Sequence, residues 1–187
     1  MNFVGSIDCL CLFNCNFSEI KIDGDTYALG YESALEEYRT MIYINKTTSI
    51  TFVIPVQATL GGESYYYIGS SIMGNLTPIT KGIKMPYSKS LVVPAISNTT
   101  NSGQILRKYV GKNCYEITIE RNPIPSVDNL NIFREINRRL GKTGVIVFYE
   151  GAGEQEKVYM CRRTNNLSYT ESRASGWEEK WDFREIT

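Results

Sequence analysis

Alternating apolar and polar positions dominate the last third of the chain and predict β-strands there. The segment 115–121 places its tyrosine and isoleucines on one face of an extended chain and polar residues on the other. The segment 177–186 alternates in the same way, with Trp181 and Phe183 on one face and charged residues on the opposite face. Such alternation is typical of strands that have one buried face in an antiparallel sheet.

Turn signals join several apolar segments into hairpins. Asp23 and Gly24 follow a short alternating segment and form a tight-turn pair. The unbroken apolar run 145–149, which we expect to be buried on both faces, is followed by a glycine-containing turn and a returning strand over 156–163. Further strands are expected over 4–17, 41–44, 49–57, 64–68 and 90–93.

Helical periodicity is confined to two segments. Around 128–140, Ile132, Ile136 and Leu140 recur at intervals of four residues, and a glycine follows as a helix C-cap. A weaker form of the pattern predicts a short helix over 31–39. The expected fold class is therefore mainly β, an antiparallel β-sandwich or β-barrel with one helix around 128–140 and a short one at 31–39.

Length and composition are compatible with a single β-rich domain over residues 1–187. Of the 187 residues 42% are hydrophobic, which suffices for a substantial core. Residues 69–104 are rich in Gly, Ser, Asn, Thr and Pro, so we expect a long loop-rich insertion with short strands there. No apolar run approaches the ~18–20 residues of a membrane-spanning helix. The first residues lack the features of a secretory signal.

The charge and the residue inventory argue against several classes of function. The 20 basic and 20 acidic residues give a formal net charge of zero, unlike a nucleic-acid binder that works by bulk electrostatics. The chain has no histidine, so Ser-His-Asp triads, Cys-His dyads and His-ligated metal sites are excluded. Gly141-Lys142-Thr143 lacks the upstream glycine of a phosphate-binding loop and follows a helical pattern instead of a strand. We therefore expect no catalytic residue and no cofactor.

The five cysteines are expected to be reduced and to pack as small hydrophobic residues. Cys9, Cys11 and Cys15 have a Cys-x-Cys-x-x-x-Cys spacing that offers three thiolate ligands, so a metal site is the alternative. Zinc ligands more commonly come as Cys-x-x-Cys pairs, and the sequence contains no second pair. Cys9 and Cys11 would share one face of a strand, which suits packing equally well.

Aromatic and basic clusters are the candidates for contacts with other molecules. A run of three tyrosines must expose at least one ring, which suits a protein interface or a stacking platform for a ligand. The basic clusters are expected to be salt-bridge partners or interface residues, because the overall charge is balanced. The interface candidates are Tyr65, Tyr66, Tyr67, Arg138, Arg162 and Arg163.

The C-terminal part, over residues 115–187, resembles a known group of proteins in the order of its elements. A short helix is followed by an apolar strand, a glycine turn, a second strand, a polar segment and a tryptophan-rich terminal strand. That strand reads Trp177-x-x-x-Trp181-x-Phe183-x-Glu185. This architecture is similar to the end of tailed-bacteriophage tail and baseplate proteins of the tail-tube fold, which include tube, distal-tail and baseplate-hub components.

The resemblance implies a β-sandwich or barrel with a flanking helix, whose protomers assemble in rings, often six-fold, around a channel. It implies a non-enzymatic structural virion protein, made in the host cytoplasm, with neighbouring tail or baseplate proteins as partners and DNA only as passing cargo. The alternative function is a carbohydrate- or receptor-binding β-sandwich module that uses exposed tyrosines. An enzyme that relies on carboxylates, tyrosine or cysteine is a third class, and it would need a deep pocket.

Overall fold

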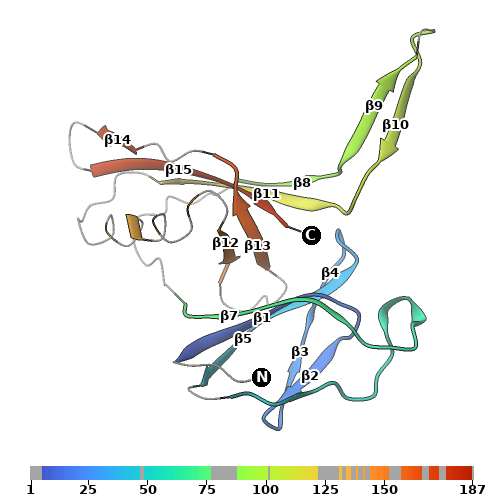
Figure 1. Cartoon of the computed structure of the whole chain (residues 1–187), viewed down its shortest axis with the longest axis vertical. Coiled ribbons are helices and arrows are strands. Elements are labelled where there is room, and N and C mark those ends of the chain that lie inside the picture. Colours follow the sequence, from blue (N-terminus) through green and yellow to red (C-terminus); the bar gives the residue numbers. More distant parts are fainter. Residues whose placement is uncertain are drawn as a thin grey trace. The chain divides into compact units, whose positions relative to one another are not determined.

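The chain, in a computed structural model, is mainly antiparallel β-structure, as the sequence predicts (Figure 1). It separates into two compact units, Met1–Pro78 with Val147–Tyr159 and Ile79–Ile146 with Met160–Thr187. That the whole chain is one folding domain stays a prediction. The described residues are 6–46, 49–76, 88–100, 102–121, 131, 134–135, 138, 141, 144–151, 157–165, 169–172 and 176–186.

The first unit contains two antiparallel sheets. Its elements are β1 (Ile7–Cys15), β2 (Glu19–Ile22), β3 (Asp25–Ala28), β4 (Gly30–Glu32), β5 (Glu37–Lys46), β6 (Phe52–Val53), the 3₁₀ turn η1 (Leu60–Gly62) and β7 (Ile68–Gly74). The larger sheet has the strand order β4-β5-β1-β7, and the smaller has the order β3-β2-β6. Asp23 and Gly24 join β2 to β3 with φ angles of 51° and 98°, which confirms the predicted tight turn.

The main core of the first unit lies on the face of the larger sheet that carries Leu10 and Leu12 of β1. Both side chains are buried, and they belong to one cluster with Ile42 of β5 and with Ile20 of β2 in the smaller sheet. Burying an aliphatic side chain of this size contributes about 1.5–3 kcal/mol. Side chains from both sheets therefore share a core, as in a sandwich.

β1 changes its facing pattern at a β-bulge. Its register with β5 shifts between Leu12 and Cys15, and Asn14 has a φ of 52°. The extra residue returns Cys15 to the core face that Leu10 and Leu12 occupy. Asparagine adopts this left-handed conformation more readily than most side chains, which suits it to the bulge.

The opposite face of the larger sheet is also buried. Cys9, Cys11 and Phe13 of β1 are 6%, 2% and 4% exposed. Cys11 lies directly opposite Met41 of β5, which is buried too. β1 is therefore covered on both faces, unlike the half-buried strands of an open antiparallel sheet.

The short helix predicted over 31–39 is wrong, because these residues form a β-hairpin. Gly30–Glu32 is β4, and its Tyr31 lies opposite Tyr38 of β5. The centroids of the two tyrosine rings are 5.1 Å apart. Two aromatic residues spaced by seven positions imitate a two-turn helical repeat, but here they face each other across a turn.

The turn of this hairpin is held by local hydrogen bonds. The backbone N–H of Ala34 donates to the Glu32 carboxylate, and the N–H of Leu35 donates to the Glu32 carbonyl. Glu36 completes the turn with a φ of 55°. A helix is incompatible with that positive φ, and a glutamate gives no indication in the sequence that its φ will be positive.

The helix predicted around 128–140 is not confirmed. Within that segment the structure describes Asn131, Arg134, Glu135 and Arg138, all of helical conformation. The apolar positions that carried the prediction lie outside the described residues. The described chain contains no helix of seven or more residues.

A six-stranded sheet has the order β12-β13-β15-β11-β8, with β14 beside β15, and its residues belong to the second unit except 147–149 of β12 and 158–159 of β13. The strands are β8 (Ser88–Val92), β11 (Cys114–Arg121), β12 (Val145–Tyr149), β13 (Val158–Arg163), β14 (Tyr169–Ser172) and β15 (Gly176–Glu185). Ile117 and Ile119 of β11 lie opposite Phe183 and Trp181 of β15, and all four side chains are buried. The predicted apolar faces of these two strands are confirmed for the described side chains.

The predicted pairing of 145–149 with the following strand is confirmed, but its burial on both faces is wrong. β12 is an edge strand beside β13, and Val145 is 40% exposed. The other residues of β12 are partly exposed. No described sheet closes into a barrel, so each edge strand has one side without a neighbouring strand in its sheet.

The described part of residues 69–104 contains short strands, as expected, and the loop-rich character of the whole range stays a prediction. Besides β7 and β8, they include β9 (Ala95–Thr99) and the residues that lead into β10 (Ile105–Tyr109). β9 and β10 pair antiparallel with each other and with no other described strand. In Figure 1 this hairpin, named the arm below, extends away from the ends of β8 and β11.

Candidate assembly interface

The arm exposes an unusual amount of apolar surface. Ile96, Ile105 and Tyr109 are 54%, 63% and 71% exposed. Apart from Thr100, every side chain described in the arm is exposed. A two-stranded hairpin has no core of its own and is marginally stable at best in water. These exposed apolar side chains make the arm a candidate surface for contact with another molecule.

One face of the arm combines apolar and basic side chains. In the register of the ribbon, Ile105, Arg107 and Tyr109 point to one face, because alternate residues of a strand share a face. Lys108 lies on the other face, opposite Ile96. The outer edges of both strands are unpaired among the described strands, which leaves backbone donors and acceptors available for a neighbouring chain.

The arm is ordered at its base and at its tip. The N–H of Val110 donates to the carbonyl of Pro94 at the base, with 2.8 Å between the two atoms. At the tip the N–H of Thr100 donates to the Gln104 carbonyl, and Gly103 turns the chain with a φ of 80°. Backbone hydrogen bonds therefore join the two strands of the arm at both ends.

The three consecutive tyrosines have different environments. Tyr66 is part of the fold: its hydroxyl donates to the Gln57 carbonyl and accepts from the Gln57 N–H, and its ring contacts Phe17 edge-on. Tyr65 is 61% exposed, so the expectation that at least one ring faces solvent holds. The Tyr67 ring lies 6.3 Å from that of Tyr65, between centroids. Burial, followed by the carboxylate of Glu63, raises the pKa of Tyr67.

Asn16 fixes the backbone of this tyrosine segment, a role that no sequence pattern predicts. Its buried side chain donates to the carbonyl of Tyr65 at 2.8 Å and accepts from the N–H of Tyr67 at 2.9 Å. Its own carbonyl accepts from the N–H of Leu60. The side-chain amide of Asn16 thus satisfies two backbone groups of the tyrosine segment, its backbone carbonyl satisfies a third group at Leu60, and only long-range contacts identify this role.

The arginine candidates lie in the second unit and the tyrosines in the first. Arg138 is exposed and pairs with Glu135 three residues earlier, at 2.8 Å. Arg162 is exposed on β13. Arg163 is partly exposed and donates to the carbonyl of Gly141 at 3.3 Å. The structure therefore gives Arg138 and Arg163 local partners, and the role of these residues in an interface stays a prediction.

The three N-terminal cysteines do not share one face of β1, so the structure does not bring together the three ligands that their spacing offers. The bulge at Asn14 places Cys15 on the face opposite Cys9 and Cys11. Burial raises the pKa of Cys15 to about 12, and the charge of Glu37 adds to the rise. No group of three cysteine or carboxylate side chains suited to a metal occurs among the described residues.

All five cysteines are buried, as expected for small hydrophobic residues, and none of them forms a disulfide. Cys9 and Cys11 are hydrogen-bonded neighbours on one face of β1. This contact lowers the pKa of Cys9 and raises that of Cys11. Only one of the two thiols can therefore lose its proton readily.

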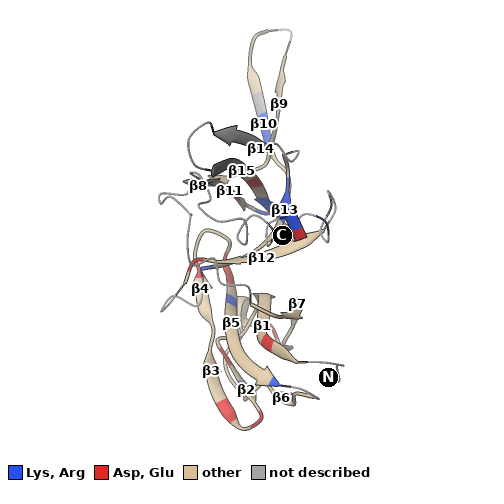
Figure 2. Ribbon diagram, turned by 90° about the vertical axis from the view of Figure 1, so that its left-hand side faces the viewer, with Lys and Arg blue, Asp and Glu red and all other residues tan. Residues whose placement is uncertain are grey.

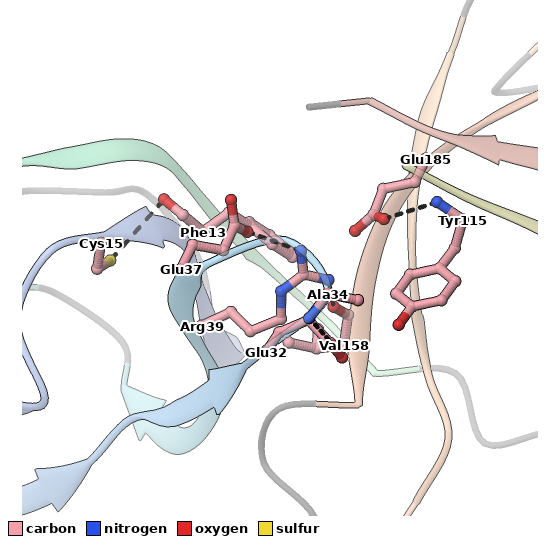
Figure 3. Close-up of polar contacts among 9 residues, drawn as sticks. All are labelled: Phe13, Cys15, Glu32, Ala34, Glu37, Arg39, Tyr115, Val158 and Glu185. Atoms are coloured by element: carbon pink, nitrogen blue, oxygen red, sulfur yellow. Dashed lines mark hydrogen bonds and ion pairs between the residues drawn. The ribbon is translucent and has the colours of Figure 1, made fainter. Parts of the chain in front are cut away.

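A buried ion pair holds the segment Val147–Tyr159 to the rest of the first unit. Arg39 Nη2 and Glu37 Oε1, both on β5, are 2.7 Å apart, and both side chains are almost fully buried. Arg39 Nη1 donates to the carbonyl of Val158 at 3.0 Å (Figure 3). The guanidinium also lies 5.7 Å from the ring centroid of Tyr159. These contacts explain why an arginine is buried here, which the sequence pattern did not predict.

The second unit has a comparable buried carboxylate. Glu185 of β15 accepts a hydrogen bond from the backbone N–H of Tyr115 at 3.1 Å (Figure 3). Its side chain is on the buried face of β15 that the alternation predicts for Trp181 and Phe183. A hydrogen bond of this kind explains how a carboxylate is retained on an aromatic face.

No protein-family model matches the chain, and no curated protein matches it. In the part of the chain that the structure describes, no helix has the length and apolar character needed to cross a membrane. The function must therefore be argued from the surfaces described above.

Proposed function

We propose that this protein is a non-enzymatic structural component of a phage tail or baseplate that assembles into rings with copies of itself and with neighbouring tail proteins. The arm is the observation that supports this most directly. It is a preformed hairpin with three large apolar side chains in solvent, namely Ile96, Ile105 and Tyr109. A protein that acts alone in solution gains nothing from such an element.

An unprotected sheet edge supports the same proposal. β7 lies at the end of the larger sheet of the first unit and pairs only with β1 among the described strands. Its sequence, Ile68 to Gly74, contains no charged residue and no proline, the usual devices that keep sheet edges apart. Such an edge accepts a strand of a neighbouring subunit, and a ring of such contacts closes it.

Sedimentation velocity and electron microscopy of the purified full chain test the proposal. We expect ring-shaped oligomers whose population rises with protein concentration. The double variant I105S/Y109S should shift the distribution toward the monomer without changing the circular-dichroism melting curve, because both side chains lie in solvent. A wild-type chain that stays monomeric at all concentrations and with candidate partners would contradict the proposal.

The genomic context provides a second, independent test. We expect the gene to lie among genes for tail tube, tail sheath, tape-measure or baseplate proteins. A gene surrounded by metabolic genes would contradict a role in the virion. In a particle that carries the protein, antibodies should label the tail and not the capsid.

A carbohydrate- or receptor-binding module is the second candidate function. The observation that favours it is the exposed ring of Tyr65 beside that of Tyr67, an arrangement on which a sugar can stack. In that case a monomeric chain should bind a glycan array, and Tyr65→Ala should abolish the binding. Tyr43→Ala, at another exposed tyrosine, is the matched control.

A further inference from the structure

Acidic and basic residues are segregated between the two compact units. The first unit has 11 Asp and Glu against 4 Lys and Arg, a formal net charge of −7, and the second has 9 against 16, a net charge of +7. The net charge of zero for the whole chain therefore conceals two oppositely charged parts. Of the described acidic side chains in the first unit only Glu37 is buried, and Asp23, Asp25, Glu36 and Glu63 are exposed.

The arm and its flanks carry basic charge only. From Ser88 to Lys112 the sequence contains four basic residues and no acidic one. Arg107 and Lys108 of β10 are exposed, and neither has an ion-pair partner within the described chain. Figure 2 shows this basic segment on β10 and acidic residues on β3. Charge of this sign attracts an acidic surface, and the first unit supplies one.

We propose that the arm of one copy docks on the acidic first unit of the next copy, so that the chains join head to tail. The proposal rests on the self-assembly proposed above and names the two surfaces that meet. Arg107 forms charge-assisted hydrogen bonds with carboxylates of the neighbour. Ile105 and Tyr109, on either side of it, bury their apolar surface in the same contact. The guanidinium suits this role because it binds carboxylates in a fixed, two-pronged geometry.

A second copy is the partner that the charges favour. The two net charges are equal and opposite, and every copy carries both surfaces, so each contact uses one arm and one first unit. The contact is heterologous, because it joins two different patches of the same chain. Repetition of such a contact closes a ring or extends a filament.

Three exposed carboxylates of the first unit are the candidate acceptors. Asp23 is excluded because it already pairs with Lys46 at 3.0 Å. The candidates are Asp25 on β3, Glu36 in the turn between β4 and β5, and Glu63 after η1. None of them is buried. Glu63 also accepts a hydrogen bond from the buried Asn16 side chain at 3.4 Å, so the stability of its reversal is compared with that of the wild type.

Two neighbouring charge reversals test the face of the arm. Arg107→Glu changes the proposed contact face, and Lys108→Glu makes the same change on the opposite face of the same strand. We expect R107E to abolish the oligomers in sedimentation velocity at physiological salt and K108E to retain them. Raising the salt concentration should dissociate the wild-type oligomer, since salt screens exposed charges beyond about 8–10 Å. Equal effects of the two reversals would overturn the assignment to this face.

A mixing experiment tests the head-to-tail arrangement. The variant D25K/E36K/E63K keeps its arm, and R107E keeps its acidic surface. Each should be monomeric alone, whereas an equimolar mixture should form a 1:1 dimer, because one arm and one acidic surface remain. Two monomers that stay apart on mixing would overturn the proposal.

The outcomes separate this proposal from the proposed function. Oligomers that persist in R107E and in D25K/E36K/E63K would overturn the head-to-tail contact and leave self-assembly intact. A wild-type chain that never associates would overturn both. Circular-dichroism melting curves of all variants establish that the differences arise from association and not from unfolding.

Discussion

The side chain of Asn14 fills the space directly over Gly69. The two residues lie between the pairs Phe13–Ser70 and Cys15–Ile68 of the β1–β7 ladder. A Cβ atom on Gly69 would lie 2.7 Å from Asn14 Nδ2 and 2.8 Å from Asn14 Cβ. The bulge of β1 and the glycine of β7 are therefore two parts of one arrangement.

Gly69→Ala should destabilise the protein by about 1–3 kcal/mol, as overpacking does in tightly packed sites. The measurement is the free energy of unfolding in urea. Gly74→Ala, in the same strand with no atom within 4 Å of the added Cβ, is the control and should change that free energy by less than about 0.5 kcal/mol. The second change Asn14→Gly should recover part of the loss, because it removes the side chain that the new methyl group meets. Similar values for the two alanine variants would refute the close approach.

Arg39→Met should cost about 3–5 kcal/mol, because it leaves the Glu37 carboxylate buried without its partner. Chemical denaturation measures the loss. Lys46→Met breaks the ion pair between Lys46 and Asp23, in which the two side chains are 42% and 30% exposed. This change should cost no more than about 1 kcal/mol. A loss for Arg39→Met as small as the loss for Lys46→Met would mean that the pair is hydrated.

Trp181→Ala should cost roughly 3–5 kcal/mol, as large-to-small changes in a core do. The indole is 4% exposed, lies opposite Ile119 and packs against Phe183 with 5.6 Å between ring centroids. Denaturant unfolding of the variant and of Lys180→Ala, an exposed neighbour on the other face, provides the comparison. A change below about 0.5 kcal/mol for Trp181→Ala would mean that the face of β15 is assigned wrongly.

Stability should fall at alkaline pH in part because of Cys15. The folded protein holds this proton up to about pH 12, whereas the thiol of an unfolded chain titrates near ~8.5. The folded state binds the proton more tightly, so its advantage is complete below pH ~8.5 and is lost as the pH rises toward 12. Urea melts at pH 7.5 and 10 should show a smaller loss for Cys15→Ala than for the wild type. An equal loss in both proteins would exclude this thiol as a cause.

Strands with a regular two-residue alternation were the part of the fold that the sequence predicted well. The faces of β11 and of the described part of β15 follow directly from their alternation, as does the Asp23–Gly24 turn. The hairpin at 31–39 was missed because Tyr31 and Tyr38 have the spacing of a helical repeat, and only their pairing across the sheet decides between the two structures. The edge position of β12 was missed because burial depends on neighbours that a local pattern does not contain.

The sequence predicts the type of residue in the candidate interface but not the element that carries most of it. The sequence indicated aromatic residues in solvent, and Tyr65 is one of them. The arm was hidden in a segment whose Ser, Asn, Thr and Gly content suggests loops, because a hairpin that contacts nothing else carries no buried face to produce a pattern. Arg39 bonds to a partner 119 residues away, and Asn16 bonds to partners 49 and 51 residues away. A local sequence pattern does not contain such partners.

The first unit is built from two segments that are far apart in the sequence, so the ribosome synthesises them at different times. The strands β1 to β7 are complete by Gly74. The carbonyl of Val158 that accepts a hydrogen bond from Arg39, and the ring of Tyr159 that lies beside it, are synthesised more than 80 residues later. The nascent chain must therefore keep this arginine hydrated, or covered by a chaperone, through most of translation. A stall before Tyr159 should leave the N-terminal sheet sensitive to protease, and release of the completed chain should protect it.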